Sequence, residues 1–385
     1  METLYFMLSN IKKKVFQFSN SLRKPIEKRY KNHKGFFCPV PFEKLWVNDS
    51  HYTICCLSGS PMRHVGETNL INPIDAWNGE KTKAFRKSIL DGSFRFCSGC
   101  PSLAPKVPPL ARIDEINDPF YADIIQNKRL TVSKIGYLNL AYDRSCNLKC
   151  PSCRTQFIHL SEGPEYERLK TLQNKIIKDF LLKNNNIDKV EYLKVTGSGD
   201  PFGSKLYMDL LKSINDKDYP PFNITILTNG VLLTEKTWSE LSCMNHRIKE
   251  IEISVDAVQE ETYSLIRGGS WKILSKNLRF ISRLRNEGRI DFFKIIMVVQ
   301  KHNWKEMKDF IQMGKDLNVD EISFSPIRPW SGNKTHCEKS AVHVPSHPEY
   351  HSLLDYLKDP IFNGDSSVKI QLGALQSLRP ISQKK

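Results

Sequence analysis

Three thiols fall within one short segment, Cys146-Asn147-Leu148-Lys149-Cys150-Pro151-Ser152-Cys153, directly after the apolar run 135–142. The spacing C-x₃-C-x₂-C suits three corners of a cubic 4Fe–4S cluster, in which each thiolate holds one iron. The fourth iron would have no protein ligand nearby and could bind a small molecule. Two alternatives remain open from spacing alone. One is a zinc site, which usually pairs two C-x₂-C units, and the other is three cysteines of an ordinary core.

Strand-like and helix-like segments alternate from residue 134 onward. The helical segments have apolar residues at a spacing of three and four. Six such units predict an α/β fold with parallel strands and outer helices, a partial (β/α)₆ barrel of the TIM type. The predicted strands are 135–141, 190–195, 224–227, 251–255, 292–299 and 322–324.

Polar side chains follow the predicted strands, where a barrel of this kind carries its chemistry. Because the carboxyl ends of parallel strands share one rim, we expect these residues to lie near the three thiols. They are Gly197, Ser198, Gly199 and Asp200 after the second strand, Thr228 and Asn229 after the third, Ser254 and Asp256 at the fourth, Gln300 at the fifth and Arg328 after the sixth.

A second group of cysteines precedes the barrel, in residues 36–105. A predicted β-hairpin, 45–47 with 52–54, leads to two adjacent cysteines, and a C-x₂-C turn closes the unit. Four ligands could saturate a metal centre, and from the residues alone an iron–sulfur cluster and a zinc ribbon are equally suitable. The candidates are Cys38, one of Cys55 and Cys56, Cys97 and Cys100.

Together these motifs resemble the radical S-adenosylmethionine (radical SAM) enzymes. The resemblance implies a SAM-binding 4Fe–4S cluster on Cys146, Cys150 and Cys153, and reductive cleavage of SAM to a 5′-deoxyadenosyl radical that takes hydrogen from a substrate. It also implies contacts to SAM. The turn Gly197-Ser198-Gly199-Asp200 matches the family's usual Gly-Gly-Glu, which holds the amino group of SAM. Thr228 and Asn229 match a position of the family that lies near SAM. Ser254 and Asp256 match the position that binds the ribose of SAM. Arg328 is a further cofactor-binding candidate.

The unit before the barrel is similar to the SPASM or twitch domains of such enzymes, which implies one auxiliary 4Fe–4S cluster on the second cysteine group. We therefore expect an auxiliary cluster domain at 36–105 and a radical SAM barrel at 134–328. A basic lead-in at 1–35, a linker at 106–133 and a closing segment at 329–385 complete the predicted organisation.

Composition limits the partners. The net charge of +15 comes from 57 basic and 42 acidic residues, but the lysines are spread along the chain, so a nucleic-acid partner is not expected. No apolar run approaches the ~18 residues of a membrane span. Ten cysteines without an export signal indicate reduced thiols and a cytoplasmic protein.

The sequence thus predicts a radical SAM oxidoreductase that dehydrogenates or epimerises a small molecule, such as a sugar or sugar nucleotide. Its electrons would come from a partner such as flavodoxin or ferredoxin. Cys337, after the sixth strand, is a candidate hydrogen-atom donor to a substrate radical. The alternatives are a maturase of a ribosomally made peptide and, from another class, a zinc-stapled nucleic-acid-binding protein.

Overall fold

The computed structural model describes residues 33–55, 64–98, 100, 103, 110–183, 187–329 and 333–379. Almost all of the predicted basic lead-in, together with Cys56, lies outside these residues. In the described part of the chain, no helix has the length and apolar character needed to cross a membrane.

Six consecutive parallel strands confirm the predicted partial barrel. Each pairs in parallel with the next along the chain. Among the described strands the sheet order is linear, so the barrel stays open. The strands are β6 (Lys134–Ala141), β7 (Lys189–Val195), β8 (Asn223–Thr228), β9 (Ile248–Ser254), β10 (Phe292–Val299) and β11 (Glu321–Pro326).

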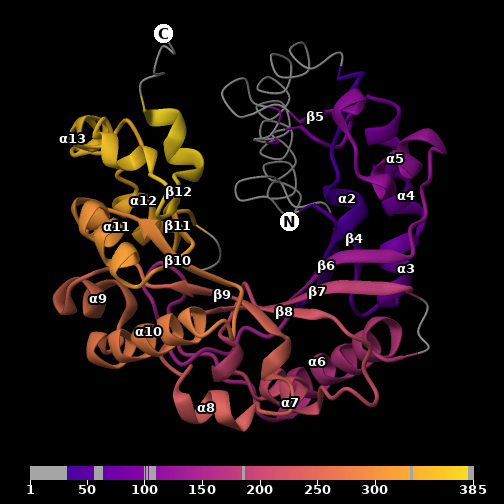
Figure 1. Cartoon of the computed structure of the whole chain (residues 1–385), viewed down its shortest axis with the longest axis horizontal. Helices are drawn as coiled ribbons and strands as arrows, with labels where there is room; N and C mark the ends of the chain where they lie inside the picture. Colours follow the sequence, from indigo (N-terminus) through magenta and orange to yellow (C-terminus); the bar gives the residue numbers. More distant parts are fainter. Residues whose placement is uncertain are drawn as a thin grey trace, which may run out of the picture.

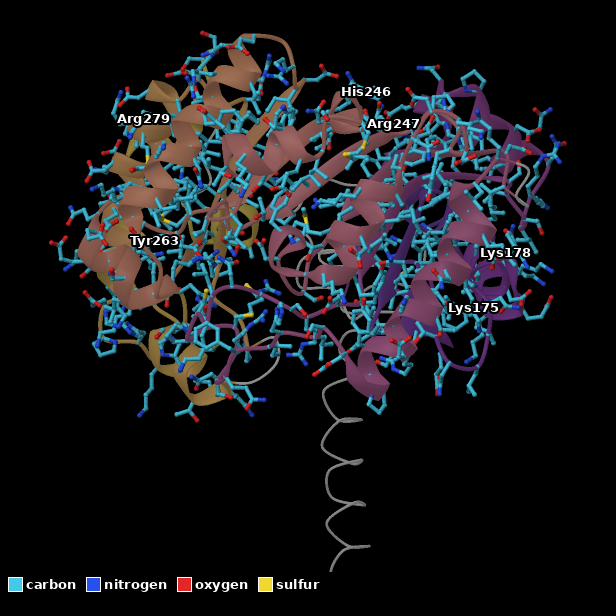
Figure 2. All side chains as sticks on the ribbon, turned by 90° about the horizontal axis from the view of Figure 1, so that it is seen from below. Lys175, Lys178, His246, Arg247, Tyr263 and Arg279 are labelled. Carbon is cyan, nitrogen blue, oxygen red and sulfur yellow. The ribbon has the colours of Figure 1, made fainter. Side chains whose placement is uncertain are left out.

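Helices cover the outer face of this sheet and give the molecule the outline of an open crescent (Figure 1). Several begin at a residue whose side chain accepts a backbone N–H of the first turn, as at Ser204, Thr234 and Ser270. The helices are α6 (Gly163–Ile176), α7 (Lys205–Ser213), α8 (Glu235–Glu240), α9 (Glu260–Arg267), α10 (Trp271–Asn286) and α11 (Met307–Asp316). Figure 2 shows basic side chains on both flanks, with Lys175 and Lys178 on one and Arg279 on the other.

The two faces of the sheet differ because side chains alternate along a strand. One set is buried beneath the helices, including Leu138, Leu193 and Phe293. The other set is polar and forms ion pairs between neighbouring or nearby strands: Lys194 with Glu252 at 2.6 Å, and Lys294 with Glu321 at 2.8 Å. The concave side of the open barrel is therefore a polar surface.

The predicted hairpin forms and continues the barrel sheet. It consists of β2 (Lys44–Asn48) and β3 (His51–Thr53), followed by β4 (His64–Glu67), and β2 pairs in parallel with β6. The same unit holds β1 (Phe36–Phe37), α2 (Val40–Glu43), α3 (Pro73–Asn78) and α4 (Glu80–Leu90).

The stretch predicted as a linker carries structure of its own. It contains β5 (Ala111–Arg112), which pairs with β1, and α5 (Pro119–Gln126). Tyr121 of α5 donates a hydrogen bond to Glu43 at 2.5 Å. The predicted domain boundaries stay predictions, because sheet pairing alone does not define a unit that folds by itself.

The chain after β11 forms α12 (Lys334–Ser340), α13 (Tyr350–Tyr356) and β12 (Lys369–Gln371), which extends the sheet beside β11. These elements lie within the predicted closing segment, 329–385. Figure 1 shows α12 and α13 at the end of the crescent opposite the N-terminal unit.

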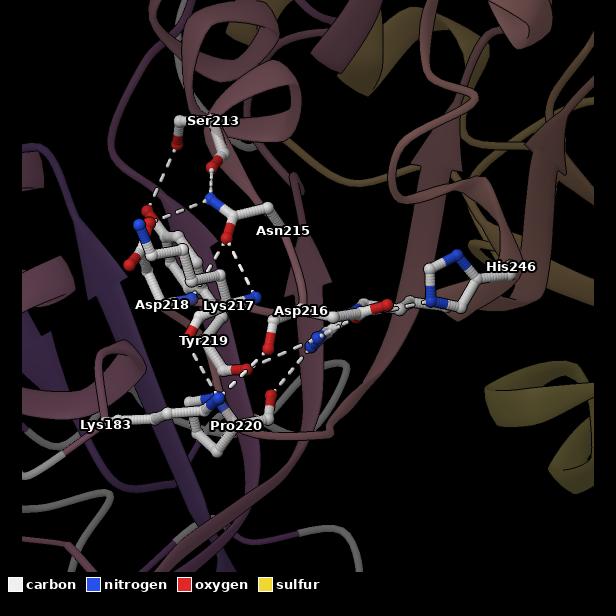
Figure 3. Close-up of polar contacts among 10 residues, drawn as sticks. Lys183, Ser213, Asn215, Asp216, Lys217, Asp218, Tyr219, Pro220 and His246 are labelled. Atoms are coloured by element: carbon white, nitrogen blue, oxygen red, sulfur yellow. Dashed lines mark hydrogen bonds and ion pairs between the residues drawn. The ribbon is translucent and has the colours of Figure 1, made fainter.

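The amino-terminal ends of β8 and β9 are fastened by the loop 213–220. Arg247, almost fully buried, donates to Pro220 O at 2.7 Å and to Asp216 Oδ1 at 3.1 Å. Figure 3 shows Asp216 of this loop facing His246, whose Nε2 lies 3.5 Å from the same carboxylate. This network lies at the opposite strand ends from the cysteine segment.

Candidate active site

The three cysteines of the central motif line one cavity of about 140 Å³ at the carboxyl ends of the strands. The segment after β6 folds back on itself, because Cys146 N–H donates to Ile158 O and Cys153 N–H donates to Cys150 O, each at 2.9 Å. Cys150 is buried, whereas Cys146 and Cys153 are partly exposed. The structure therefore places the three thiols at the rim of the open barrel, where the sequence predicts them.

The glycine-rich turn after β7 forms a second wall of this cavity. Ser198 Oγ donates to Ala141 O at 2.7 Å, and Asp200 N–H donates to Ser145 O at 2.8 Å. A Cβ atom on Gly199 would lie 2.4 Å from Ser145 O. Glycine is therefore required where this turn contacts the cysteine segment.

Asp200 supports the site from behind and does not line the cavity. It is 1% exposed, and its carboxylate accepts from Thr228 Oγ1 at 2.6 Å, Asn229 N–H at 2.8 Å and Phe202 N–H at 3.0 Å. Burial raises the pKa of Asp200, and these hydrogen bonds oppose the rise. Both oxygens accept hydrogen bonds from within the chain, and the predicted contact of Asp200 with the amino group of SAM stays a prediction.

Thr228 and Asn229, at the end of β8, do line the cavity. Asn229 Nδ2 donates to Asn147 Oδ1 at 2.8 Å and lies 3.7 Å from Cys146 Sγ, within hydrogen-bonding reach of sulfur. The third strand is thus joined directly to the cysteine segment.

At the end of β9, Ser254 lines the cavity but Asp256 does not. Asp256 is buried with a positive φ of 70°, and it accepts from Val298 N–H at 2.6 Å and from Arg267 at 3.1 Å. Burial raises the pKa of Asp256, while Arg267 opposes the rise. Like Asp200, Asp256 therefore forms hydrogen bonds within the chain at the strand ends, here with Val298 and Arg267.

Two arginines complete the cavity, and sequence reasoning missed both as site residues. Arg267 Nη2 donates to Ser254 O at 2.9 Å, and its Nε is buried without a hydrogen-bond partner among the described residues. Burial opposes the charge of Arg267, but Cys150 and Asp256 outweigh burial and raise its pKa. Arg154 Nη2 donates to Ser198 O at 3.0 Å and lies 3.5 Å from Cys153 Sγ. The only signal available for Arg154 was its place directly after the third cysteine.

The surroundings of the three sulfurs fit an iron–sulfur cluster. Besides the contacts from Asn229 and Arg154, Leu148 N–H donates to Cys146 Sγ at 3.4 Å, and hydrogen bonds to sulfur are a means by which proteins tune such clusters. Burial, then Asp200, raises the pKa of Cys146 to about 11, so metal binding would release a proton. Among the described residues, no three His, Cys, Asp or Glu side chains converge on a single ion. A cubic cluster does not need that arrangement.

Arg328 and Cys337 line a different cavity, beside β10 and β11. Cys337 is nevertheless close to the motif, since its Sγ donates to Ser152 O at 3.5 Å. Gln300 is 1% exposed and lines neither cavity.

The structure describes four cysteines of the second group, which are Cys38, Cys55, Cys97 and Cys100. Cys38 has Cys55 and Cys100 in its electrostatic surroundings, and burial, followed by smaller effects of these thiols, raises its pKa to about 12. Cys97 N–H and Cys100 N–H both take part in the closing turn, which joins Cys100 N–H to Cys97 O at 3.0 Å. Cys56 lies outside the described residues, so the choice between Cys55 and Cys56 stays open.

A family model described as the Radical SAM superfamily matches residues 143–314. A GTP 3′,8-cyclase of Alkaliphilus oremlandii is 26% identical over 247 residues, covering 60% of this chain and 72% of that protein. A GTP 3′,8-cyclase of Clostridium perfringens is 30% identical over 204 residues, covering 51% of this chain and 56% of that protein. Relatives of this kind are thus matched over only part of their length.

Two solved structures have a distant likeness to the chain. Streptococcus suis SuiB bound to its precursor peptide SuiA gives a TM-score of 0.44 at 15% identity, covering 81% of this chain and 67% of that one. The anSMEcpe protein with bound AdoMet gives 0.38 at 18% identity, covering 61% and 63%. Scores at this level carry no functional argument.

Proposed function

We propose that this chain, whose residues 143–314 match the Radical SAM superfamily model, cleaves SAM at the cavity formed by Cys146, Cys150 and Cys153 and abstracts hydrogen from a C–H bond of a small-molecule substrate. The observation that carries the proposal is the convergence of these three thiols with residues from the ends of three further strands on one cavity. Cys146, Cys150 and Cys153 would hold a 4Fe–4S cluster, which would supply the electron for cleavage of SAM to methionine and a 5′-deoxyadenosyl radical. The match to the Radical SAM superfamily model favours this enzyme class over a nucleic-acid-binding protein with structural zinc.

The protein's part is to hold and orient SAM beside the cluster. Gly197, Ser198 and Gly199 offer backbone groups, and Thr228, Asn229 and Ser254 offer polar side chains along the same wall. Asp200 acts behind them by accepting a hydrogen bond from Asn229 N–H, and Asp256 by pairing with Arg267.

Arg267 lines this cavity, and its guanidinium, although paired with Asp256 at 3.1 Å, carries more N–H groups than Asp256 and Ser254 accept. A guanidinium so placed suits the carboxylate of a bound amino acid, because it donates hydrogen bonds in a fixed fork and stays charged. We therefore include Arg267 among the proposed SAM contacts and assign Arg328 to the neighbouring cavity.

The proposed auxiliary 4Fe–4S cluster is held by Cys38, Cys55 or Cys56, Cys97 and Cys100. Support comes from the closeness of Cys55 and Cys100 to Cys38, whose pKa both of them raise, and from the C-x₂-C turn. Such a cluster would accept the electron of an oxidised product or anchor the substrate.

A nucleotide or other small substrate is favoured over a peptide, because the relatives matched in sequence include proteins named for their action on GTP. The polar concave face of the barrel, with the pairs Lys194–Glu252 and Lys294–Glu321, suits a polar substrate as well. A peptide substrate is the competing outcome of the test below.

The test is anaerobic. After reconstitution with iron and sulfide, we expect about eight irons per chain (two cubes of four), and 5′-deoxyadenosine after addition of dithionite and SAM. Cys150→Ala should lose about four irons and all 5′-deoxyadenosine, whereas Cys243→Ala, which removes an exposed thiol, should match the wild type. Deuterium transfer from labelled small molecules or peptides into 5′-deoxyadenosine then identifies the substrate class. Purified protein that holds zinc and no iron would contradict the proposal.

A further inference from the structure

A second cavity, of about 870 Å³, opens beside the carboxyl ends of β10 and β11. Lys301 and Arg328, which follow these two strands, line it together with α12 and the segment after α12. Lys301 N–H donates to Ser340 O at 2.9 Å, so the end of α12 is fastened to the end of β10. The volume suits a small-molecule site, for which about 300–1,000 Å³ is usual.

The side chain of Cys337 lies between this cavity and the proposed reaction centre. Cys337 lines the cavity and is 1% exposed, and its Sγ donates to Ser152 O between Cys150 and Cys153. A ligand in the second cavity would therefore lie next to the segment that carries the three thiols.

Three cations in the wall of this cavity lack a counter-ion. Lys301, Arg328 and Lys339 all line it, and none of them forms an ion pair with another described residue. Uncompensated positive charge around a concave site attracts an anion, and low-dielectric walls strengthen the attraction.

The two acidic residues of the lining form their ion pairs with lysines outside it and not with these cations. Glu338 lies 3.7 Å from Lys334, and Glu349 lies 3.5 Å from Lys305. Neither lysine lines the cavity.

His343 adds an unused polar atom to the same wall. Its Nδ1 is buried and has no hydrogen-bond partner among the described residues. Burial, followed by the nearby charge of Arg328, lowers the pKa of His343, so the ring is neutral near pH 7 and one of its nitrogens can donate a hydrogen bond.

We propose that this cavity binds a phosphate group of the substrate through Arg328 and Lys301, so that the enzyme acts on a phosphorylated small molecule. Three uncompensated cations match a multiply charged phosphate better than a singly charged carboxylate. The inference rests on the proposed function, since a substrate subsite presupposes the reaction centre beyond Cys337.

The experiment is calorimetric titration of the iron-reconstituted full chain with inorganic pyrophosphate, without SAM or reductant. We expect one-to-one binding. The double variant Arg328→Gln/Lys301→Gln should weaken it at least tenfold, and Arg328→Lys should retain most of it. The matched control Arg279→Gln/Lys272→Gln removes the same charge from exposed positions of α10 and should stay within twofold of the wild type.

Three outcomes would overturn the inference: no one-to-one binding by the wild type, equal loss in the two double variants, or citrate binding as tightly as pyrophosphate. The last would assign the cavity to carboxylates. Because 5′-deoxyadenosine formation is measured separately, its presence without pyrophosphate binding would reject the phosphate subsite alone. Its absence with pyrophosphate binding would reject the proposed activity alone.

Discussion

Gly199 and Gly197 differ in the space around their Cα atoms, although they stand in one turn. A Cβ on Gly199 would lie 2.4 Å from Ser145 O and 2.7 Å from Asp143 O, which are backbone atoms that cannot rotate away. On Gly197 the nearest atom would be 3.8 Å away. We expect Gly199→Ala to cost about 1–3 kcal/mol of folding free energy and to displace the cysteine segment.

The measurement is thermal unfolding together with iron content after reconstitution. Gly199→Ala should lose about four of eight irons per chain (one cube of four), and Gly197→Ala should keep them. Equal behaviour of the two variants would mean that contact between the turn and the cysteine segment does not position the thiols.

At the scale of elements, Arg247 joins the start of β9 to the loop before β8. Its guanidinium donates to Pro220 O and packs 5.0 Å from the centre of the Phe222 ring. Arg247→Met keeps the apolar stem and leaves the partly buried Pro220 carbonyl without its charged donor, so we expect a loss of about 1–3 kcal/mol.

Urea denaturation measures this loss, with His246→Met as the control. His246 is half exposed, and its Nε2 lies 3.5 Å from the exposed carboxylate of Asp216, so its replacement should change stability by less than about 0.5 kcal/mol. Because this network lies at the strand ends opposite the thiols, 5′-deoxyadenosine formed per iron should not change in either variant. A selective loss of activity would contradict this separation.

At the scale of the whole molecule, the N-terminal unit and the barrel share one sheet. Leu45 of β2 is fully buried beside β6, and its register partner is Leu138. Leu45→Ala should lower the free energy of unfolding by about 2–5 kcal/mol, and the loss should reach the barrel because β2 covers the edge of β6.

Hydrogen exchange of backbone amides measures how far this loss spreads. Faster exchange in β6 and β7, together with β2, is expected for one cooperative unit. If only residues 36–105 become labile, the predicted domain boundary describes an independent folding unit.

The sequence by itself determined the six parallel strands, the outer helices and the rim at which the three thiols meet the glycine-rich turn. These features follow from local patterns, since alternating apolar runs, helix caps and turn glycines act over a few residues. The same patterns placed Thr228, Asn229 and Ser254 at this rim.

Only the tertiary structure decided what each polar residue faces. Asp200 turns inward to hold Asn229, and Asp256 turns inward to Val298 of β10. Arg267 lines the cavity of the three thiols from the end of α9, and Arg328 lines a second cavity. It also decided that β2 continues the barrel sheet. Contacts of this kind join residues that are tens of positions apart, so their hydrogen bonds and charges depend on how the strands and helices pack, which no local pattern records.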